Sequence, residues 1–330
     1  MGIIKKAVLS TPFLAILCCL LWATPFVGIK IGLRYSEPLQ FAGIRFTLAG
    51  LMILPFIPNL KIKWKSAIKH WKVMVIIALI QTTFLYSMFY IGLNMVPGYV
   101  GALIVGSGPV FVAITANFMM KDDKMNWQKV IAVIIGLVGL TIVTLAGTSK
   151  YGADAVDSVA KNSGIFTGTV TLGIILLLVK NFLGSVGNVY IARDANNINP
   201  RVLAAFSLVF GGILIILLSI ILEKPSWNTD VPAEFYYSWI WLSIVSATAI
   251  AIWYSLLQRP GVKVSILNFW TFIIPVFGAL FSWMILPGEE PDFWSIVGMI
   301  IIGFSLFFIN YANRHTKKST INKIKSYKRV

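Results

Sequence analysis

The chain has 330 residues, of which 58% are hydrophobic and 12% are charged, and its formal net charge is +16. Soluble domains carry about 25% charged residues, so this composition excludes a water-soluble globular protein. The basic residues lie in short gaps between apolar stretches and in a C-terminal tail, which argues against a nucleic-acid-binding surface.

Ten apolar stretches follow one another along the chain. A helix needs about 20 residues to cross about 30 Å of hydrocarbon, because each residue adds about 1.5 Å. We place the ten spans at residues 11–33, 38–58, 72–93, 97–119, 128–146, 165–190, 200–222, 237–257, 264–286 and 293–312. The polar segment 147–164 connects five spans in 11–146 with five in 165–312, and a basic tail follows at 313–330. The prediction is one all-α transmembrane domain over residues 1–330.

The basic residues indicate how the spans are oriented. Most of the 28 Lys and Arg residues fall in the N-terminal segment, in every second gap and in the tail; the other gaps hold Arg34, Lys150, Lys161 and Lys224. Short basic loops stay on the cytoplasmic side of a membrane. Both termini are therefore predicted to be cytoplasmic, in a multi-pass protein of the inner cell membrane whose basic residues contact anionic lipid headgroups.

The two sets of five spans share prolines and small residues in the same order. The matched pairs are Pro38 with Pro200, Ala42 with Ala204, Gly50 with Gly212, and Pro109-Val-Phe111 with Pro275-Val-Phe277. Because five is odd, the second set must enter the membrane from the opposite side, which makes the repeats inverted. Transporters use inverted repeats to open a central cavity alternately to each side. A duplication kept only for its structure is the alternative.

Three basic residues lie more than two residues from either end of a predicted span, and Asp and Glu are absent from all ten spans. A charge at the centre of a span costs at least about 2.5–3.5 kcal/mol, so Lys30, Arg45 and Lys180 are candidates for function. Lys30 lies about one turn from a span end and could instead extend to the interface. Arg45 could brace the helices. Lys180 is expected to face a cavity that accepts a carboxylate or phosphate.

Other polar and aromatic side chains inside the spans are expected to complete that cavity. The full set is Trp22, Gln81, Tyr86, Tyr90, Ser107, Lys180, Asn181, Ser185, Asn188, Tyr254, Asn268 and Trp270. Breaks in the helical hydrogen bonding are expected at Gly106, Gly108 and Pro109 in the fourth span and at Pro275 in the ninth, because proline lacks the backbone N–H. Backbone groups freed in this way survive in a membrane when they are buried or face a water-filled cavity.

Six segments of the chain form a pattern of motifs in a fixed order. They are Leu21-Trp-Ala-Thr-Pro-Phe-Val-Gly-Ile-Lys30, Phe41-Ala-Gly-Ile-Arg-Phe-Thr-Leu-Ala-Gly50, Gly101-Ala-Leu-Ile-Val-Gly-Ser-Gly-Pro-Val-Phe111, Gly136-Leu-Val-Gly139, Pro275-Val-Phe277 and Leu286-Pro-Gly-Glu289. In these segments the chain resembles the drug/metabolite transporter superfamily, in particular its EamA-like ten-helix members. The chain departs from the family pattern directly after the fourth span. The family often has an acidic residue at this place, where this chain has Lys121-Asp122-Asp123. The resemblance implies a solute carrier of the cell membrane that usually exports amino acids, metabolites or drugs.

The expected function is transport, with export as the expected direction, of amino acids or other small organic solutes, including anions. Exchange or facilitated diffusion is expected, because proton coupling through an intramembrane acid would need a carboxylate that the spans lack. A channel or a structural membrane partner is the alternative. An enzyme is not expected, because the spans offer no metal ligands or acid–base pairs. The sequence predicts no cofactor and no metal, and it leaves a homodimer open.

Overall fold

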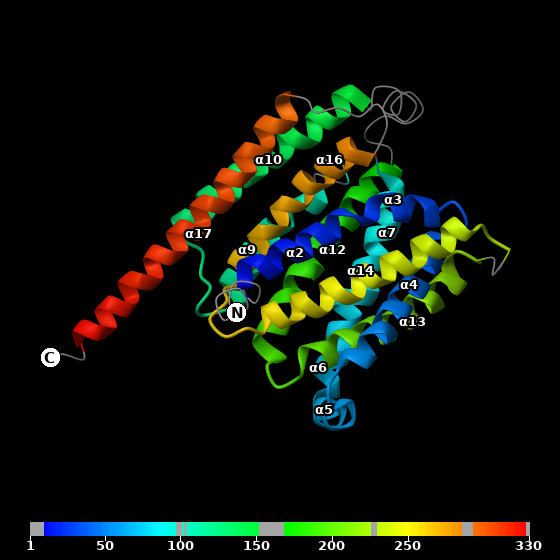
Figure 1. Ribbon diagram of the computed structural model, residues 1–330, viewed down its shortest axis with the longest axis horizontal. Helices are drawn as coiled ribbons and strands as arrows, with labels where there is room; N and C mark the ends of the chain where they lie inside the picture. The colour runs from blue at the N-terminus through cyan, green and yellow to red at the C-terminus, as the bar shows by residue number, and fades with distance from the viewer. Residues whose placement is uncertain are drawn as a thin grey trace.

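The computed structural model describes residues 10–96, 101, 104–151, 168–225, 230–285 and 293–327, and within these ranges the regular secondary structure is entirely helical. The α-helices are α2 (Thr11–Ala23), α3 (Pro25–Gly32), α4 (Pro38–Ile53), α5 (Leu60–Ala67), α6 (Trp71–Ala78), α7 (Leu85–Met95), α9 (Gly108–Met119), α10 (Trp127–Tyr151), α12 (Gly168–Asp194), α13 (Pro200–Leu222), α14 (Ala233–Leu257), α15 (Val264–Phe269), α16 (Ile273–Ile285) and α17 (Phe293–Tyr327). Short 3-10 segments are η1 (Leu54–Phe56), η2 (Ile68–His70) and η4 (Trp270–Phe272), and η3 (Leu79–Phe84) is a π-helix. Figure 1 shows the helices arranged side by side.

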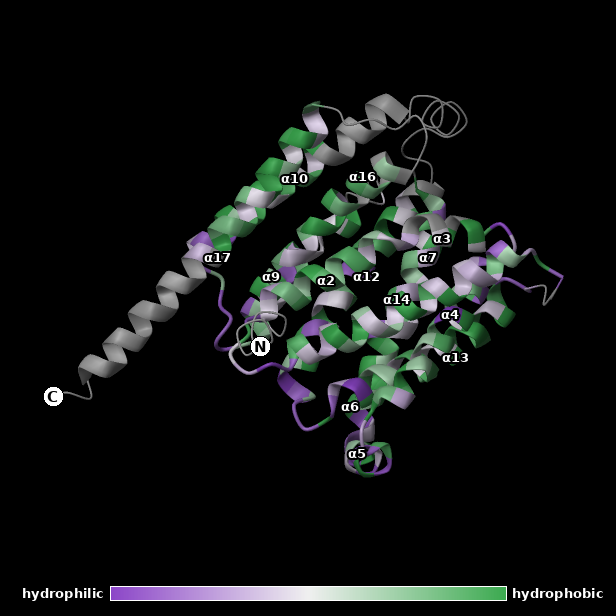
Figure 2. Ribbon diagram, viewed as in Figure 1, coloured by the Kyte–Doolittle hydropathy of each residue, from purple (hydrophilic) through white to green (hydrophobic). Residues whose placement is uncertain are grey.

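The apolar helices follow the ten predicted stretches in order. Five helical segments of the described chain are long and apolar enough to cross a membrane: Pro38–Phe56, Leu60–Met95, Thr171–Asp194, Pro200–Leu222 and Ala233–Leu257. The other predicted stretches contain shorter apolar helical segments, at Thr11–Ala23, Ile104–Met119, Trp127–Ile142, Val264–Phe277 and Phe293–Ile309. Figure 2 shows hydrophobic residues along most of these helices.

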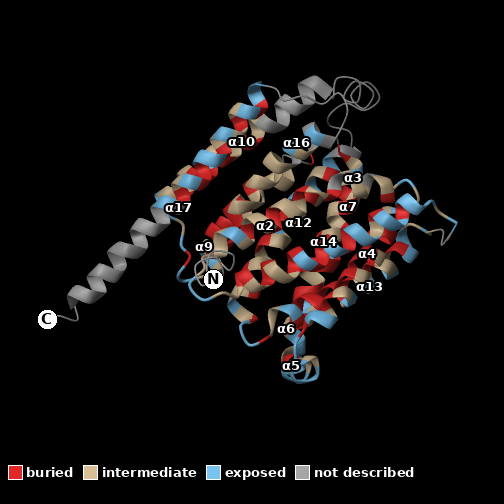
Figure 3. Ribbon diagram, viewed as in Figure 1, coloured by how far each residue is buried: buried red, intermediate tan, exposed pale blue. Residues whose placement is uncertain are grey.

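Large apolar side chains also cover the outside of the protein. On α13, Ile221 is 72% exposed, and on α17, Phe307 is 68% exposed. Figure 3 shows that buried residues gather where helices meet, as at α4 and α13, whereas exposed residues lie on outward faces. A soluble monomer rarely exposes so much contiguous apolar surface, so these outward faces are suited to contact lipid.

Several helix boundaries differ from the predicted spans. The first span is divided at Thr24 because Pro25 begins α3 and has no N–H to continue the hydrogen bonding of α2. The third span contains the π-helix η3, and the predicted gap before it forms the amphipathic helix α5. At the other end of the chain, α17 continues through the predicted basic tail to Tyr327.

The segment that connects the two predicted halves begins later in the chain than predicted. Helix α10 continues to Tyr151, beyond the predicted span end at residue 146. Residues 152–167, which make up most of the predicted connecting loop, lie outside the described part of the chain, as do residues 97–100 at the start of the fourth span.

Helices α4 and α13 approach so closely that glycine is required at their crossing. A Cβ atom added to Gly212 of α13 would lie 2.6 Å from the backbone nitrogen of Thr47 and 3.1 Å from the carbonyl oxygen of Gly43, both in α4. Real Cβ atoms essentially never come within 3.0 Å of a heavy atom in this way. Small residues permit this close packing of helix backbones, which stabilises helix pairs in a membrane by van der Waals contact.

The crossing is reciprocal between the two helices. A Cβ atom added to Gly50 of α4 would lie 2.7 Å from the backbone nitrogen of Val209 and 2.8 Å from the carbonyl oxygen of Ala205, both in α13. One shift in residue number pairs Gly50 with Gly212, Thr47 with Val209 and Gly43 with Ala205. Each helix therefore presents the same contact to the other, as at an interface between two copies related by a two-fold axis.

Other helix contacts show the same correspondence between the two halves of the chain. Helix α10 packs along α17, and α9 packs on α15. The contact of α2 and α3 with α14 corresponds to the contact of α12 with α7, and the contact of α4 with α14 corresponds to that of α13 with α6 and η3. The helices of the N-terminal part of the chain thus pack mainly against helices of the C-terminal part.

We predict that Gly212→Ala destabilises the protein even though alanine is the better helix former. The added methyl group meets backbone atoms of α4 that cannot rotate away, and overpacking of this kind costs about 1–3 kcal/mol. The measurement is thermal unfolding of the purified protein in detergent, followed by tryptophan fluorescence.

Gly303→Ala in α17 is the matched control, because a Cβ atom there has no heavy atom within 4 Å. This substitution should leave the unfolding temperature unchanged or raise it, since alanine favours a helix over glycine by about 1 kcal/mol. Equal unfolding temperatures for the two variants would contradict the close crossing.

Candidate functional site

A cavity of about 290 Å³ lies between the two parts of the chain. Its walls come from α2 and α3, α4, η3 and α7, α9, α12, α14, and the segment from α15 to α16. The lining residues are Trp22, Pro25, Ile29, Arg45, Gln81, Leu85, Tyr86, Phe89, Tyr90, Val105, Gly108, Val112, Lys180, Asn181, Gly184, Ser185, Asn188, Ile250, Trp253, Tyr254, Asn268, Thr271 and Ile274. Cavities lined by apolar and aromatic groups with a few placed polar groups are the usual form of small-molecule sites.

Most of the residues expected at a cavity lie together in this one. Those that line it are Trp22, Gln81, Tyr86, Tyr90, Lys180, Asn181, Ser185, Asn188, Tyr254 and Asn268. Ser107 and Trp270 do not line it. Ser107 lies behind Asn181 and accepts a hydrogen bond from its Nδ2 at 3.3 Å, whereas the Trp270 carbonyl oxygen is contacted by the Cys19 thiol at 3.2 Å.

Three amide side chains form a chain of hydrogen bonds across the cavity wall. Gln81 Nε2 donates to Asn188 Oδ1 at 2.8 Å, and Asn188 Nδ2 donates to Asn268 Oδ1 at 2.9 Å. Asn268 Nδ2 in turn donates to the carbonyl oxygen of Val264 at 2.9 Å. The chain joins η3, α12 and α15, so the position of each helix depends on the other two.

Lys180 supplies a positive charge in the cavity wall. Its Nζ donates to Asn181 Oδ1 at 3.2 Å and lies 5.5 Å from the centre of the Phe89 ring. Asn181 is itself fixed because its Nδ2 donates to the carbonyl oxygen of Ile104. No Asp or Glu occurs among the described residues that line the cavity. An ammonium has three N–H donors, so Lys180 can bind an anionic group while it keeps its bond to Asn181.

Arg45 is held by side chains from two other helices. Its Nη1 donates to Tyr90 Oη at 2.6 Å, and its Nη2 and Nε donate to Ser246 Oγ at 2.9 and 3.3 Å. The guanidinium carbon also lies 4.7 Å from the centre of the Phe46 ring, and the residue is 6% exposed. These contacts favour the bracing role for Arg45, although the side chain also reaches the cavity.

A second polar group repeats the arrangement around Arg45 without the charge. Ser207 Oγ of α13 shares hydrogen bonds with Thr82 Oγ1 at 2.9 Å and with Tyr254 Oη at 3.4 Å. The shift that pairs Gly50 with Gly212 pairs Arg45 with Ser207, and another single shift pairs Tyr90 with Tyr254 and Thr82 with Ser246. Each group thus joins one helix of the α4–α13 crossing to the same two neighbours, and Arg45 makes the pair asymmetric.

Aromatic rings form much of the remaining wall. Trp22 and Trp253 contact edge to face, with ring centres 5.0 Å apart. Trp253 lines the cavity beside Tyr254, its neighbour in the eighth span, as the sequence predicts for these two aromatic residues. Phe89 also lines the cavity but is absent from the predicted set. The sequence did carry a signal for Phe89, because it lies three residues after Tyr86 on the same helical face.

The predicted helix breaks flank the cavity. Helix α9 begins at Gly108, after a turn at Ser107, and Pro109 occupies its first turn. In the ninth stretch, η4 separates α15 from α16, and Pro275 lies in the first turn of α16. Gly108 of the first break lines the cavity, and a Cβ atom added to Gly106 would lie 2.7 Å from Leu140 Cδ2. The side chain of Lys30 lies outside the described part of the structure.

The apolar exterior, the membrane-length helices and a mainly apolar cavity with a few placed polar groups between repeated halves define a multi-pass membrane transporter. The model of the EamA-like transporter family matches the chain twice, over residues 9–145 and 171–311. The chain therefore belongs to the EamA-like transporter family, within the drug/metabolite transporter type that the sequence resembles.

Proteins with similar sequences are also described as transporters. A transporter of Archaeoglobus fulgidus with no assigned solute is 25% identical over 88% of this chain and 94% of its own length. The S-adenosylmethionine/S-adenosylhomocysteine transporter of Chlamydia trachomatis serovar L2 is 23% identical over 90% of this chain and 88% of its own length. A protein of known crystal structure covers 93% of this chain and 98% of its own, with a TM-score of 0.71 and 16% identity, which shows a shared fold.

We predict that Ser246→Ala lowers the unfolding temperature. The substitution removes the acceptor for two N–H groups of the buried Arg45, and a hydrogen bond to a charged group is worth about 1.5–3 kcal/mol. Thermal unfolding in detergent measures the change.

Ser255→Ala, in the same helix, is the control because Ser255 Oγ donates at 2.7 Å to the carbonyl oxygen of Ala251 one turn earlier. It should have little effect, since that bond joins no second helix. A loss of stability in Ser255→Ala as large as in Ser246→Ala would contradict the bracing role.

Proposed function

We propose that the protein carries small organic solutes, with amino acids and other small organic acids as the leading class, across the inner cell membrane. In this proposal the ten apolar stretches all cross the membrane, as two inverted five-helix repeats at 11–146 and 165–312. Both termini face the cytoplasm, and export is the expected direction. The reciprocal α4–α13 crossing supports two repeats related by a two-fold axis. Because each repeat has five spans, an odd number, that axis lies in the membrane plane and the second repeat is inverted.

The observation that carries the proposal is Lys180 in a cavity that both halves enclose. A half-buried ammonium with one side-chain acceptor and no acidic neighbour among the described lining residues favours a solute that brings its own negative charge. A carboxylate or a phosphate meets this requirement with a charge-assisted hydrogen bond. Arg45 is less suited to the role, because Tyr90 and Ser246 already accept its donors.

The dimensions and walls of the cavity narrow the solute further. Its volume of about 290 Å³ lies just below the range of about 300–1,000 Å³ for small-molecule sites, which favours a small solute. The aromatic rings of Trp22, Trp253 and Tyr254 offer apolar contact to the part of the solute that has no charge. An amino acid or a small organic acid with an apolar or ring-bearing side chain fits this combination. The Chlamydia trachomatis relative named for S-adenosylmethionine is consistent with a solute that contains an amino-acid group and a ring.

The cavity also bears on how transport is driven. Proton-coupled carriers usually protonate an intramembrane carboxylate, and the described lining contains none. Exchange or facilitated diffusion therefore fits the lining better than proton coupling. A channel is the second candidate function, because polar helices also line pores.

We predict that Lys180→Ala strongly reduces exchange of an anionic solute while the protein stays folded. Purified protein is reconstituted in vesicles loaded with an unlabelled mixture of amino acids and organic acids, and entry of each labelled solute is measured. Loss of the ammonium should reduce entry of the accepted anion at least about tenfold, the factor that 1.4 kcal/mol produces.

Lys72→Ala is the matched control, because Lys72 is an exposed residue in the first turn of α6 and does not line the cavity. Unchanged exchange in Lys180→Ala, with thermal unfolding like the parent, would remove Lys180 from the solute site.

We also predict that exchange does not need a proton gradient. A protonophore added to the vesicles should leave the rate of solute exchange unchanged, because the described cavity offers no carboxylate to carry the proton. Exchange that stops when the protonophore collapses the gradient would contradict this mode of transport.

A further inference from the structure

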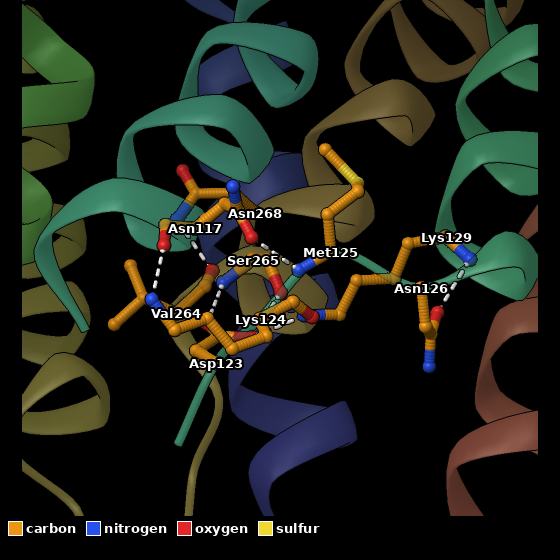
Figure 4. Close-up of polar contacts among 9 residues, drawn as sticks. All are labelled: Asn117, Asp123, Lys124, Met125, Asn126, Lys129, Val264, Ser265 and Asn268. Atoms are coloured by element: carbon orange, nitrogen blue, oxygen red, sulfur yellow. Dashed lines mark hydrogen bonds and ion pairs between the residues drawn. The ribbon is translucent and has the colours of Figure 1, made fainter. Parts of the chain in front are cut away.

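A buried ionic group lies outside the cavity, in the connection between α9 and α10 (Figure 4). Asp123 is 0% exposed and Lys129 is 2% exposed, and Lys129 Nζ lies 2.5 Å from Asp123 Oδ1. Lys129 also donates to the carbonyl oxygen of Lys124 at 2.7 Å. Removing two charges from water costs several kcal/mol per ion before their attraction is counted. A buried ion pair therefore needs hydrogen-bond partners for its remaining polar atoms.

Asp123 also binds the start of α15, in the other half of the chain. Its Oδ2 accepts a hydrogen bond from the backbone N–H of Ser265 at 2.8 Å, and its Oδ1 accepts one from Ser265 Oγ at 2.6 Å. The first N–H groups of a helix have no partner within it, so this carboxylate satisfies one of them from another segment. Figure 4 shows Asp123 between Lys129 on one side and Ser265 on the other.

The connection that carries Asp123 is itself fixed to α9 and α10. Met125 N donates to Asn117 Oδ1 at 2.8 Å, and Lys124 Nζ donates to the Asn117 carbonyl oxygen at 2.7 Å. Asn126 Oδ1 accepts from the backbone N–H of Lys129 at 2.9 Å at the start of α10. The position of Asp123 is therefore tied to the end of α9 rather than free to follow α15.

The two helices linked through Asp123, α9 and α15, also line the cavity. Val112 of α9 and Asn268 of α15 are both lining residues, and Asn268 lies one turn after Ser265. At their other ends, α9 begins after the turn at Ser107 and α15 ends at η4. Each is a short rod with a helix break beside the cavity and its far end joined to the other rod through Asp123.

We propose that Asp123, Lys129 and Ser265 form a latch that closes this end of the cavity, with Asp123 as the positioning residue. The proposal rests on the proposed function, because a carrier built from inverted repeats opens its central cavity to one side of the membrane at a time. While the latch is intact, α9 and α15 are held together and a solute cannot pass between them. Opening toward this end requires the Asp123–Ser265 bonds to break, which lets α15 turn at η4 and carries Asn268 away from Asn188.

The test measures from which side of the membrane the cavity can be reached. Cys18 and Cys19 are replaced by alanine, and Thr271→Cys, a near-isosteric change at the cavity wall, supplies one reporter thiol. The full-length protein in vesicles of known orientation is treated with a membrane-impermeant maleimide on either side, without solute. Ser265→Ala removes one latch bond and keeps the ion pair, and Asp123→Asn removes the charge. Asp122→Asn, at the exposed neighbour, is the matched control.

Both latch substitutions should increase labelling of the reporter from the Asp123 end, on the order of tenfold for Asp123→Asn and less for Ser265→Ala, because a shift of 1.4 kcal/mol between two states changes their ratio tenfold. Labelling from the opposite side should fall, and Asp122→Asn should match the parent. If Asp123→Asn does not fold, Ser265→Ala decides the question.

Two results separate the latch from the proposed function. If the parent exchanges solute and neither latch substitution alters labelling, while Ser265→Ala lowers the unfolding temperature, the group is a static brace and the latch proposal is overturned. If the parent exchanges no solute in any assay but labelling still shifts toward the Asp123 end, the latch is supported and the transport proposal fails.

Discussion

The close crossing of α4 and α13 is the constraint on which the rest of the structure depends. Their backbones meet where Gly50 and Gly212 each face a backbone nitrogen and a carbonyl oxygen of the other helix. In lipid the hydrophobic effect does not drive helices together, so van der Waals contact of this kind is a main source of helix–helix association. The contact fixes the two halves relative to each other along one line and leaves the surrounding helices to enclose a space between them.

The polar groups beside this crossing explain why Lys180, rather than Arg45, is the cation available to bind a solute in the cavity. Arg45 extends from α4 to Tyr90 and Ser246, whereas its counterpart Ser207 joins Thr82 and Tyr254 with neutral bonds. The guanidinium is thus committed to holding helices. Lys180 of α12 has no such set of acceptors and remains the group best placed to meet a solute anion. Two cations that look alike in the sequence have different environments, and the difference comes from which helices surround them.

Much of this architecture could be predicted from the sequence, because a segment that crosses a membrane is both helical and apolar. The apolar stretches of the sequence therefore mark the positions of the helices. Lys180, Asn181, Ser185 and Asn188 line one cavity because helical periodicity places them together. The partners of Arg45 could not be predicted, since they depend on the register of three helices. The division at Pro25 and the π-helix around Gln81 were missed because both are local changes within an unbroken apolar pattern. The burial of Asp123 could not be predicted, since nothing nearby in the sequence shows that Ser265 of α15 binds it.

The helix breaks, the cavity and the amide chain suggest how one half could move against the other around the fixed crossing. Short helices such as α9 and α15 can turn at the helix breaks while α4 and α13 keep their contact. Such a turn changes the hydrogen bonds among Gln81, Asn188 and Asn268 at the cavity wall. The most direct measurement of this account is the rate of entry of a labelled small organic acid into proteoliposomes, as its external concentration rises, with and without the same solute inside. A carrier of this design predicts a rate that saturates and increases when solute is present inside. A rate that rises linearly with concentration and ignores the internal solute would contradict it.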